Sequence, residues 1–192
     1  LFRLIPELFY VGEKEFKSLY RSAYNGPILR WLIRQENIGL ADTDLQEQLN
    51  NAFKSTWFCP LTDSMNINRF YKLNKIPGSH DHRPEFRSIV EILESDDAKD
   101  IAARDINDYI IKNEIKYLVL LEDFVGSGTQ IKKTIEFLAE LSEDLKILVV
   151  PLILCPEGVV TANLLMDKYS QLDFGQVIIM PRSAFILPAR QV

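Results

Sequence analysis

The chain has 192 residues, of which 47% are hydrophobic and 26% charged, enough for one domain with a sizeable buried core. Its formal net charge is −5 at pH 7, so net charge does not indicate a nucleic-acid partner, although a local basic groove is compatible with it. No apolar run reaches the ~18 residues that a membrane-crossing helix needs, so no membrane association is expected.

Two cysteines, Cys59 and Cys155, each end an apolar run and precede a proline. We expect both to be buried, reduced thiols in a cytoplasmic protein, with neither a disulfide nor a metal pair. The first ten residues lack the charged front and long apolar centre of a signal peptide, and they do not begin with Met. We therefore expect a trimmed chain or an internal segment.

The first 54 residues are expected to be helical. Residues 13–35 carry apolar side chains at helical spacing, and Asn25-Gly26-Pro27 should break this segment into two helices. Asp42-Thr43-Asp44 is a candidate N-cap for a further helix that ends near Lys54. We predict that residues 1–54 form a helical N-terminal extension packed against a later sheet. We expect the aromatic side chains of this extension to pack in the core; the alternative is that they bind a partner protein.

A short strand is predicted at residues 56–61, which are rich in residues that favour strands. Thr62, Asp63 and Ser64 then turn the chain into a helix that includes Phe70. Asp63 is suited to capping that helix. Asp63 and Ser64 are also candidates for ligand contact, and the two roles are compatible.

The clearest loop covers residues 75–84 and contains His80 and His82. Two such histidines without a third spaced ligand are a weak metal motif, so we expect a solvated loop, long and polar enough to act as an active-site lid. A helix should follow at residues 84–93, and another should be capped by residues 95–97. The second helix carries an apolar stripe made of Ile101, Ile106, Tyr109 and Ile110.

The central stretch of the chain is residues 117–130, YLVLLEDFVGSGTQ. Residues 117–121 are all apolar, which indicates a strand buried on both faces. Glu122 and Asp123 follow where that strand should end, and a loop with two glycines leads into an amphipathic helix. Parallel sheets bind ligands at the carboxyl ends of their strands, and the first N–H groups of a helix favour an anion. We expect the loop to hold a phosphate.

The two carboxylates have different expected directions. Side chains alternate along a strand, so Glu122 and Asp123 should point to different sides. We expect Asp123, next to the loop, to accept hydrogen bonds from sugar hydroxyls, and Glu122 to serve either the ligand or the structure.

The second half continues the alternation of strands and helices. Residues 147–154 should form a buried strand in which Pro151 indicates an edge or a bulge. Pro156 should open a helix, and residues 176–180 should form a further strand. This rhythm predicts an α/β fold with a mainly parallel, doubly wound sheet over residues 55–192.

The words LVLLEDFVGSGTQ resemble the fingerprint of the type I phosphoribosyltransferases: a strand, an acidic pair and a loop with Thr/Ser-Gly. Together with TWFCPLTDS upstream, they look most like a divergent branch associated with bacterial anti-phage systems. The resemblance implies a phosphoribosyl ligand, either phosphoribosyl pyrophosphate or a nucleotide, with Mg²⁺, and other subunits of a defence complex as partners. The ligand-binding residues that it implies are Glu122, Asp123, Phe124, Val125, Gly126, Ser127, Gly128 and Thr129, with Asp63 and Ser64 near the pyrophosphate.

Two departures from the fingerprint limit the chemistry. Gly126 stands where purine-salvage members have an Asp that is the proposed proton acceptor, and Gln130 stands where the fingerprint ends in Thr. Backbone binding of phosphate survives both changes, whereas general-base catalysis through Gly126 does not. The resemblance thus leaves the catalytic residues unassigned. If the chain is an enzyme, the expected reaction is transfer or cleavage at C1′ of ribose.

Two alternatives stay open. The chain could be a non-catalytic module that senses nucleotides. The run Phe124-Val125-Gly126-Ser127-Gly128-Thr129 is also similar to a motif of amino-methylating DNA methyltransferases that bind S-adenosylmethionine. Asp123 stands where that motif has Pro, and the chain lacks a Pro-Pro pair, so this interpretation requires a catalytic half outside the chain.

Overall fold

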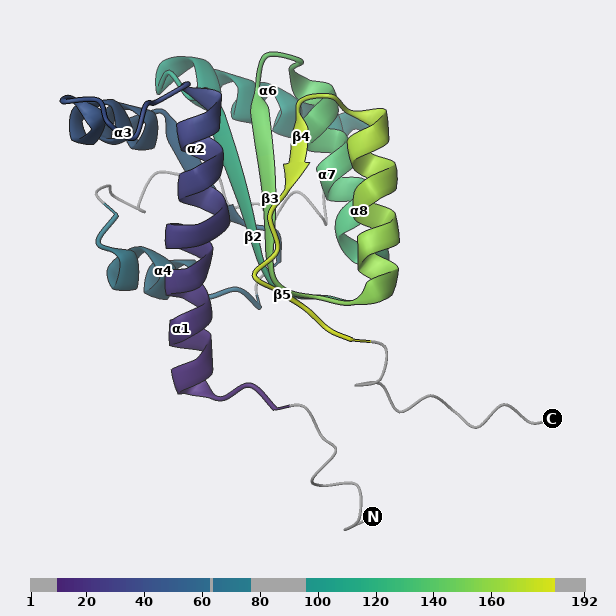
Figure 1. Ribbon diagram of the computed structural model, residues 1–192. Helices are drawn as coiled ribbons and strands as arrows, with labels where there is room; N and C mark the ends of the chain where they lie inside the picture. Colours follow the sequence, from purple (N-terminus) through teal and green to yellow (C-terminus); the bar gives the residue numbers. More distant parts are fainter. Residues whose placement is uncertain (1–9, 63, 77–95, 182–192) are drawn as a thin grey trace, which may run out of the picture.

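The computed structural model describes residues 10–62, 64–76 and 96–181, which form an α/β fold around one parallel sheet (Figure 1). The strands lie in the order β1-β2-β3-β4, and β5 pairs with the end of β3 that lies beyond β4. Every pairing among the described strands is parallel, which confirms the predicted α/β fold with a mainly parallel sheet. The strands are β1 (Thr56–Pro60), β2 (Tyr117–Val125), β3 (Lys146–Leu154), β4 (Leu172–Phe174) and β5 (Ile178–Ile179).

Three crossover helices cover one face of the sheet: α6 (Asp96–Lys112), α7 (Thr129–Leu141) and α8 (Pro156–Lys168). The sheet contributes alternate residues to this face, including Leu118 and Leu120 of β2. Within the predicted stripe of α6, Ile106 is buried and Tyr109 packs against the core, but Ile101 is 57% exposed. The strands run in sequence order across the sheet, so these helices all lie on the same side (Figure 1).

The opposite face is covered from the N-terminal side of the chain. The helices are α1 (Glu13–Ala23), η2 (Tyr24–Ile28), α2 (Leu29–Gln35) and, after β1, α4 (Ile67–Asn74). They share a core with Val119 and Leu121 of β2. Helices α1, η2 and α2 come before the sheet and pack on it as predicted, and α4 completes this second helical layer after β1. The division of the chain at residue 54 stays a prediction.

The N-terminal helix does not break where the sequence predicted. Helix α1 continues through the π-helical turn η2, which contains Pro27, directly into α2. A proline ring collides with the carbonyl one α-turn earlier and offers no N–H, and a wider π turn accommodates both defects without ending the helix. The continuous helix carries Ile28, Trp31 and Leu32 into the core.

The next helix, α3 (Leu45–Lys54), ends where predicted. Asp44 occupies its N-cap position, but its side chain makes no capping hydrogen bond and instead accepts one from Gln48 Nε2 at 2.8 Å. The helix packs Phe53 against Phe58 of β1.

Pro151 lies in an interior strand, so the prediction of an edge or bulge at this residue is wrong. Strand β3 pairs with β2 on one side along its length, and on the other side β4 pairs with residues 147–149 and β5 with residues 153–154. Pro151 falls in the gap between β4 and β5, where no paired strand residue requires a hydrogen bond from its backbone nitrogen, which carries no hydrogen. The sequence pattern also missed β4 and made β5 too long.

The structure bears on several smaller predictions. Cys59 and Cys155 are buried thiols. No helix in the described ranges is long and apolar enough to cross a bilayer, while a cytoplasmic location stays a prediction. The predicted lid from residue 77 onward, with His80 and His82, and the helix at residues 84–93 lie outside the described residues, as does Asp63.

Candidate functional site

The acidic pair lies at the carboxyl end of β2. The strand is longer than predicted and includes Glu122 and Asp123 before it ends at Val125. Residues 126–128 then form the loop, and α7 begins at Thr129. The neighbouring turn after β1 brings Thr62 and Ser64 to the same edge of the sheet. Side chains from two adjacent strand ends therefore meet beside the loop.

Two hydroxyls connect the acidic pair to the turn after β1. Thr62 Oγ1 donates to Glu122 Oε1 at 2.7 Å. Ser64 Oγ lies 3.0 Å from the same oxygen and 2.8 Å from Asp123 Oδ1. A hydroxyl has one hydrogen, so Ser64 can donate to only one of the two carboxylates at a time.

Glu122 is buried, with 3% of its surface exposed. Its Oε2 atom makes no hydrogen bond with any residue that the structure describes. Burial disfavours the charged form and raises the pKa of the Glu122 carboxyl to about 7, with the nearby Asp123 charge adding to the rise and the Thr62 and Ser64 hydroxyls opposing it. A carboxyl with this pKa changes charge near neutral pH, as proton-transfer groups do.

Asp123 is more exposed than Glu122, and its contact with sugar hydroxyls stays a prediction. Both carboxylates lie within hydrogen-bond distance of Ser64 Oγ, while the expectation that the two side chains point to different sides of the sheet stays a prediction. The turn after β1 lies across the strand end and draws both side chains toward its hydroxyls. The two carboxylates therefore meet at one hydroxyl.

Helix α8 holds the loop in place, a feature that the sequence did not indicate. Thr161 Oγ1 donates to the carbonyl of Ser127 at 2.7 Å. Gly158 lets α8 approach closely, because a Cβ atom there would lie 2.6 Å from the carbonyl oxygen of Gly126. Gly128 is buried with a φ of 80°, and a Cβ atom on it would lie 2.9 Å from Thr161.

The loop leads into a helix whose start favours an anion. Gly128 occupies the N-cap position of α7, which has no side-chain cap and no acidic residue in its first turn. Ser127 Oγ and Thr129 Oγ1 lie 2.9 Å apart at this point. The positive end of the helix dipole and two hydroxyls are thus available to a phosphate group, while convergence of the loop N–H groups stays a prediction.

The other predicted site residues have different environments. Phe124 is 49% exposed beside the loop, where its ring could pack on a ligand. Val125 is buried in the core, so its side chain does not face the site. Gly126 is partly exposed, and the nearest neighbour of a Cβ atom there would be the Phe124 ring at 3.8 Å.

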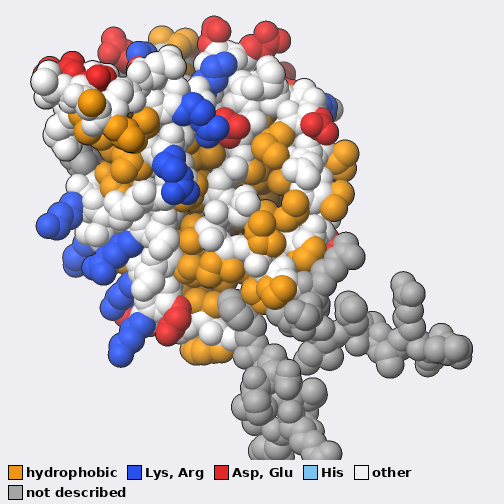
Figure 2. All heavy atoms as spheres, in the orientation of Figure 1, with side chains coloured by type: hydrophobic (Ala, Val, Ile, Leu, Met, Phe, Trp, Pro, Cys, Tyr) orange, Lys and Arg blue, Asp and Glu red, His pale blue; other side chains and the backbone are white. Residues whose placement is uncertain are grey.

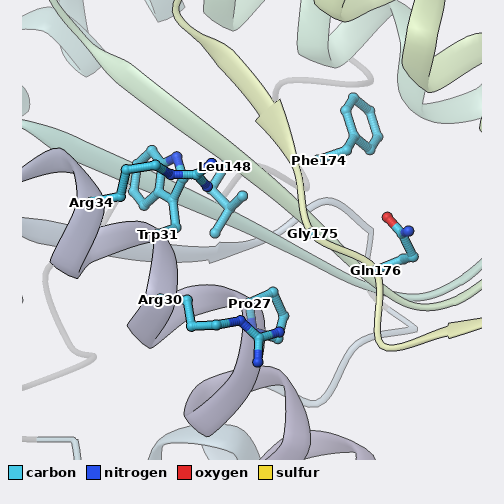
Figure 3. A pocket seen from close by; sticks show the side chains of 8 residues that line it. All are labelled: Pro27, Arg30, Trp31, Arg34, Leu148, Phe174, Gly175 and Gln176. Carbon is cyan, nitrogen blue, oxygen red and sulfur yellow. The ribbon is translucent and has the colours of Figure 1, made fainter.

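A separate cavity of about 250 Å³ lies between the N-terminal helices and the chain after β4 (Figure 3). Arg30 and Arg34 of α2 lie at its side, and Gly175 approaches Pro27 across it. Leu148, near the amino end of β3, also lines the cavity. None of the residues of the acidic pair or the loop contributes to it, so it is not part of the carboxyl-edge site.

The two loop glycines should respond differently to a methyl group. We expect Gly128→Ala to lower the free energy of unfolding by about 1–2 kcal/mol, because Ala is strained at positive φ and its methyl group would press on Thr161. Gly126→Ala should change it by less than about 0.5 kcal/mol, since that position is open. Urea unfolding followed by circular dichroism measures both. Equal losses would contradict this account of the loop.

One comparison with known proteins gives a match. A family model described as PRTase-CE matches residues 1–181, which include the N-terminal helices, the sheet and the loop. No curated protein and no solved structure matches the chain. Because the match covers nearly the whole chain, the protein belongs to the PRTase-CE family and is phosphoribosyltransferase-like.

Proposed function

We propose that the carboxyl-edge site binds a phosphoribosyl ligand, either phosphoribosyl pyrophosphate or a nucleotide. The observation that carries this proposal is the placement of Asp123 and Glu122 beside the start of α7, joined to the neighbouring strand end through Ser64. The start of α7 suits the 5′-phosphate. Asp123 suits the ribose hydroxyls, because a partly exposed carboxylate accepts strong hydrogen bonds from them.

Magnesium is part of this proposal. The described residues contain no group of three or more His, Cys, Asp or Glu side chains that could hold a metal alone. Mg²⁺ in phosphate sites is commonly held by one or two carboxylates together with waters and phosphate oxygens of the ligand, and Asp123 with Glu122 fits that donor set. The buried Oε2 of Glu122, which has no hydrogen-bond partner among the described residues, is an oxygen that such a shell could engage. When bound, the metal would neutralise charge on pyrophosphate.

The reaction that suits this site is substitution or cleavage at C1′ of the ribose. With phosphoribosyl pyrophosphate, the bond between C1′ and the pyrophosphate oxygen breaks, pyrophosphate leaves with the electron pair, and an acceptor or water forms the new bond to C1′ and releases its proton to solvent. Asp123 and the loop would orient the ring and its phosphate. Gly126 offers no side chain to take the acceptor's proton. A role in a bacterial defence complex remains part of the proposal.

Isothermal titration of the chain with phosphoribosyl pyrophosphate and Mg²⁺ tests the proposal. We expect binding in the wild type. In Asp123→Asn the dissociation constant should be roughly 10- to 100-fold larger, because a hydrogen bond to a charged group contributes about 1.5–3 kcal/mol. Asp144→Asn is the matched control, since Asp144 is exposed in the turn before β3, at the other edge of the sheet. It should leave binding within twofold of wild type.

The same titration separates the alternatives. Binding of nucleoside monophosphates but not phosphoribosyl pyrophosphate supports the nucleotide-sensing form of the proposal. Binding of S-adenosylmethionine instead of any phosphoribosyl compound would overturn it in favour of the methyltransferase interpretation. Equal weakening by Asp123→Asn and Asp144→Asn would refute the assignment of Asp123 to the ligand.

A further inference from the structure

A groove between α1 and α4 is lined mainly by Lys and Arg residues, whose aliphatic stems form much of its wall. It has a volume of about 530 Å³, and apart from Leu73 its lining consists of Lys17, Arg21, Arg69, Lys72 and Lys75. We refer to these residues as the basic groove. Figure 2 shows Lys and Arg side chains gathered over this side of the molecule, with few acidic side chains among them. A chain with a net charge of −5 thus concentrates positive charge on one surface.

The two helices that carry the groove pack against each other. Tyr20 of α1 packs edge-on against Phe70 of α4, with ring centroids 6.1 Å apart. The side chain of Asn74 donates to the carbonyl oxygen of Tyr20 at 3.3 Å. The cations stand on these packed helices at spacings of three or four residues, so they follow one another by about one helical turn, ~5 Å.

Helix dipoles explain only part of this charge. Lys72 and Lys75 lie at the end of α4, where a cation is favoured. Arg21 is near the end of α1, but that helix continues into η2, so no exposed carbonyl end lies there. Arg69 stands in the first turn of α4, where the dipole disfavours a cation. Helix dipoles and the ion pairs of Lys17 and Arg69 with Glu13 do not account for Arg21, and a ligand with several negative charges would use all five cations.

We infer that the basic groove binds the sugar–phosphate backbone of nucleic acid, independently of base sequence. A row of Lys and Arg at regular spacing matches a ligand with one negative charge per repeat, and a groove of this kind tracks the backbone of single-stranded nucleic acid. The described residues of the lining include no aromatic side chain on which a base could stack. This inference goes beyond the phosphoribosyl site, and neither depends on the other.

Glu13 modulates the groove. Its carboxylate pairs with Lys17 Nζ at 2.9 Å and with Arg69 Nη2 at 2.5 Å, so it competes with phosphate for two of the five cations. Hydrogen bonds from Lys17 and Arg69 lower the pKa of Glu13 below its ordinary value, so the ion pairs favour its charged form. Its removal should therefore strengthen nucleic-acid binding, a change of opposite sign to the loss of a cation.

Fluorescence anisotropy with a labelled 20-nucleotide oligo-uridine and oligo-thymidine tests the inference on the full chain. Four or five neutralised phosphates give a slope of log K against log salt of about −3, or roughly 60-fold weaker binding at 200 mM than at 50 mM salt. We expect Arg21→Glu/Lys72→Glu to weaken binding at least about tenfold at 50 mM salt and to make the slope shallower by about 1.4. Glu13→Gln should tighten binding, on the order of threefold.

The matched control is Arg104→Glu/Lys112→Glu, which reverses two exposed cations of α6 on the other face of the sheet. It should leave affinity within twofold, and circular dichroism should show all variants folded. Arg21→Gln/Lys72→Gln is the fallback if charge reversal unfolds the chain. Absence of binding at 50 mM salt, equal weakening by both cation pairs, or equally tight binding of polyglutamate would overturn the inference.

Discussion

Replacing Glu122 by Gln should stabilise the folded chain at neutral and alkaline pH, by up to about 3 kcal/mol. Glu122 is buried, and its Oε2 atom has no partner among the described residues, so its ionised form carries an uncompensated desolvation cost. This cost raises the pKa of Glu122 from 4.5 to about 7 in the folded state. Each unit of pKa difference corresponds to 1.36 kcal/mol. Gln keeps the shape and the oxygen that accepts from Thr62 but cannot ionise.

The sign of the pH dependence follows from the raised pKa. Because the folded state holds the proton more tightly, the contribution of Glu122 to stability is fully present below pH 4.5 and is lost as pH rises through about 7. Wild type and Glu122→Gln should therefore have similar free energies of unfolding near pH 4.5 and diverge up to about pH 7.5. Urea titrations at half-unit intervals measure this difference.

Glu143→Gln is a suitable control, because it makes the same chemical change at an exposed position before β3. It should shift the curve by no more than about 0.5 kcal/mol at any pH. A constant difference between wild type and Glu122→Gln across this range would show that Glu122 does not titrate there. If phosphoribosyl pyrophosphate binds with Mg²⁺, adding both should reduce the difference in free energy of unfolding between wild type and Glu122→Gln, since the metal compensates the buried charge of Glu122.

The central strand and its loop could be predicted because their physical signals are local. An unbroken apolar run requires burial on both faces, and the glycines and hydroxyls after it suit a turn into a helix. The carboxyl-edge position of Glu122 and Asp123 followed from that order. Their common contact with Ser64 did not, because it depends on how the turn after β1 lies across the strand end.

Other features depend on contacts between segments far apart in the chain. Thr161 and Gly158 look like ordinary residues of α8, and only their packing on residues 126–128 gives them a role. In the sequence, Gly158 and Thr161 near the start of α8 were only a weak indication of a contact with the loop. The prediction that Pro151 marks an edge or a bulge failed, because an interior strand can accept this proline only at the gap between β4 and β5. These two strands are too short to show a clear pattern in the sequence.

The basic groove could not be predicted from the sequence either, because it also depends on contacts between distant segments. Net charge sums over the whole chain, so the value of −5 correctly indicated no overall basic field and gave no information about a local one. Lys17 and Arg21 are separated by about fifty residues from Arg69 and Lys72. They come together only because α1 packs against α4.

The last prediction concerns catalysis at Gly126. The purified chain should be a poor nucleobase transferase, and Gly126→Asp should raise its rate with a free purine base and phosphoribosyl pyrophosphate. General acid–base catalysis typically contributes ~10²–10⁴-fold, so we expect an increase of at least about 10²-fold if the introduced carboxylate reaches the base. The position accepts a side chain, because the nearest atom to a Cβ there is 3.8 Å away. Chromatographic measurement of nucleotide formation follows the reaction.

Gly126→Asn separates proton transfer from shape. Asn matches Asp in size but cannot act as a base at neutral pH, so its rate should stay near that of wild type. Equal increases for Asp and Asn would mean that filling the space, rather than accepting a proton, limits the reaction. Efficient conversion of a free base by the unmodified chain would show that another group already accepts the proton. The proposed grip on the phosphoribosyl ligand would then stand, while the role assigned to Gly126 would be wrong.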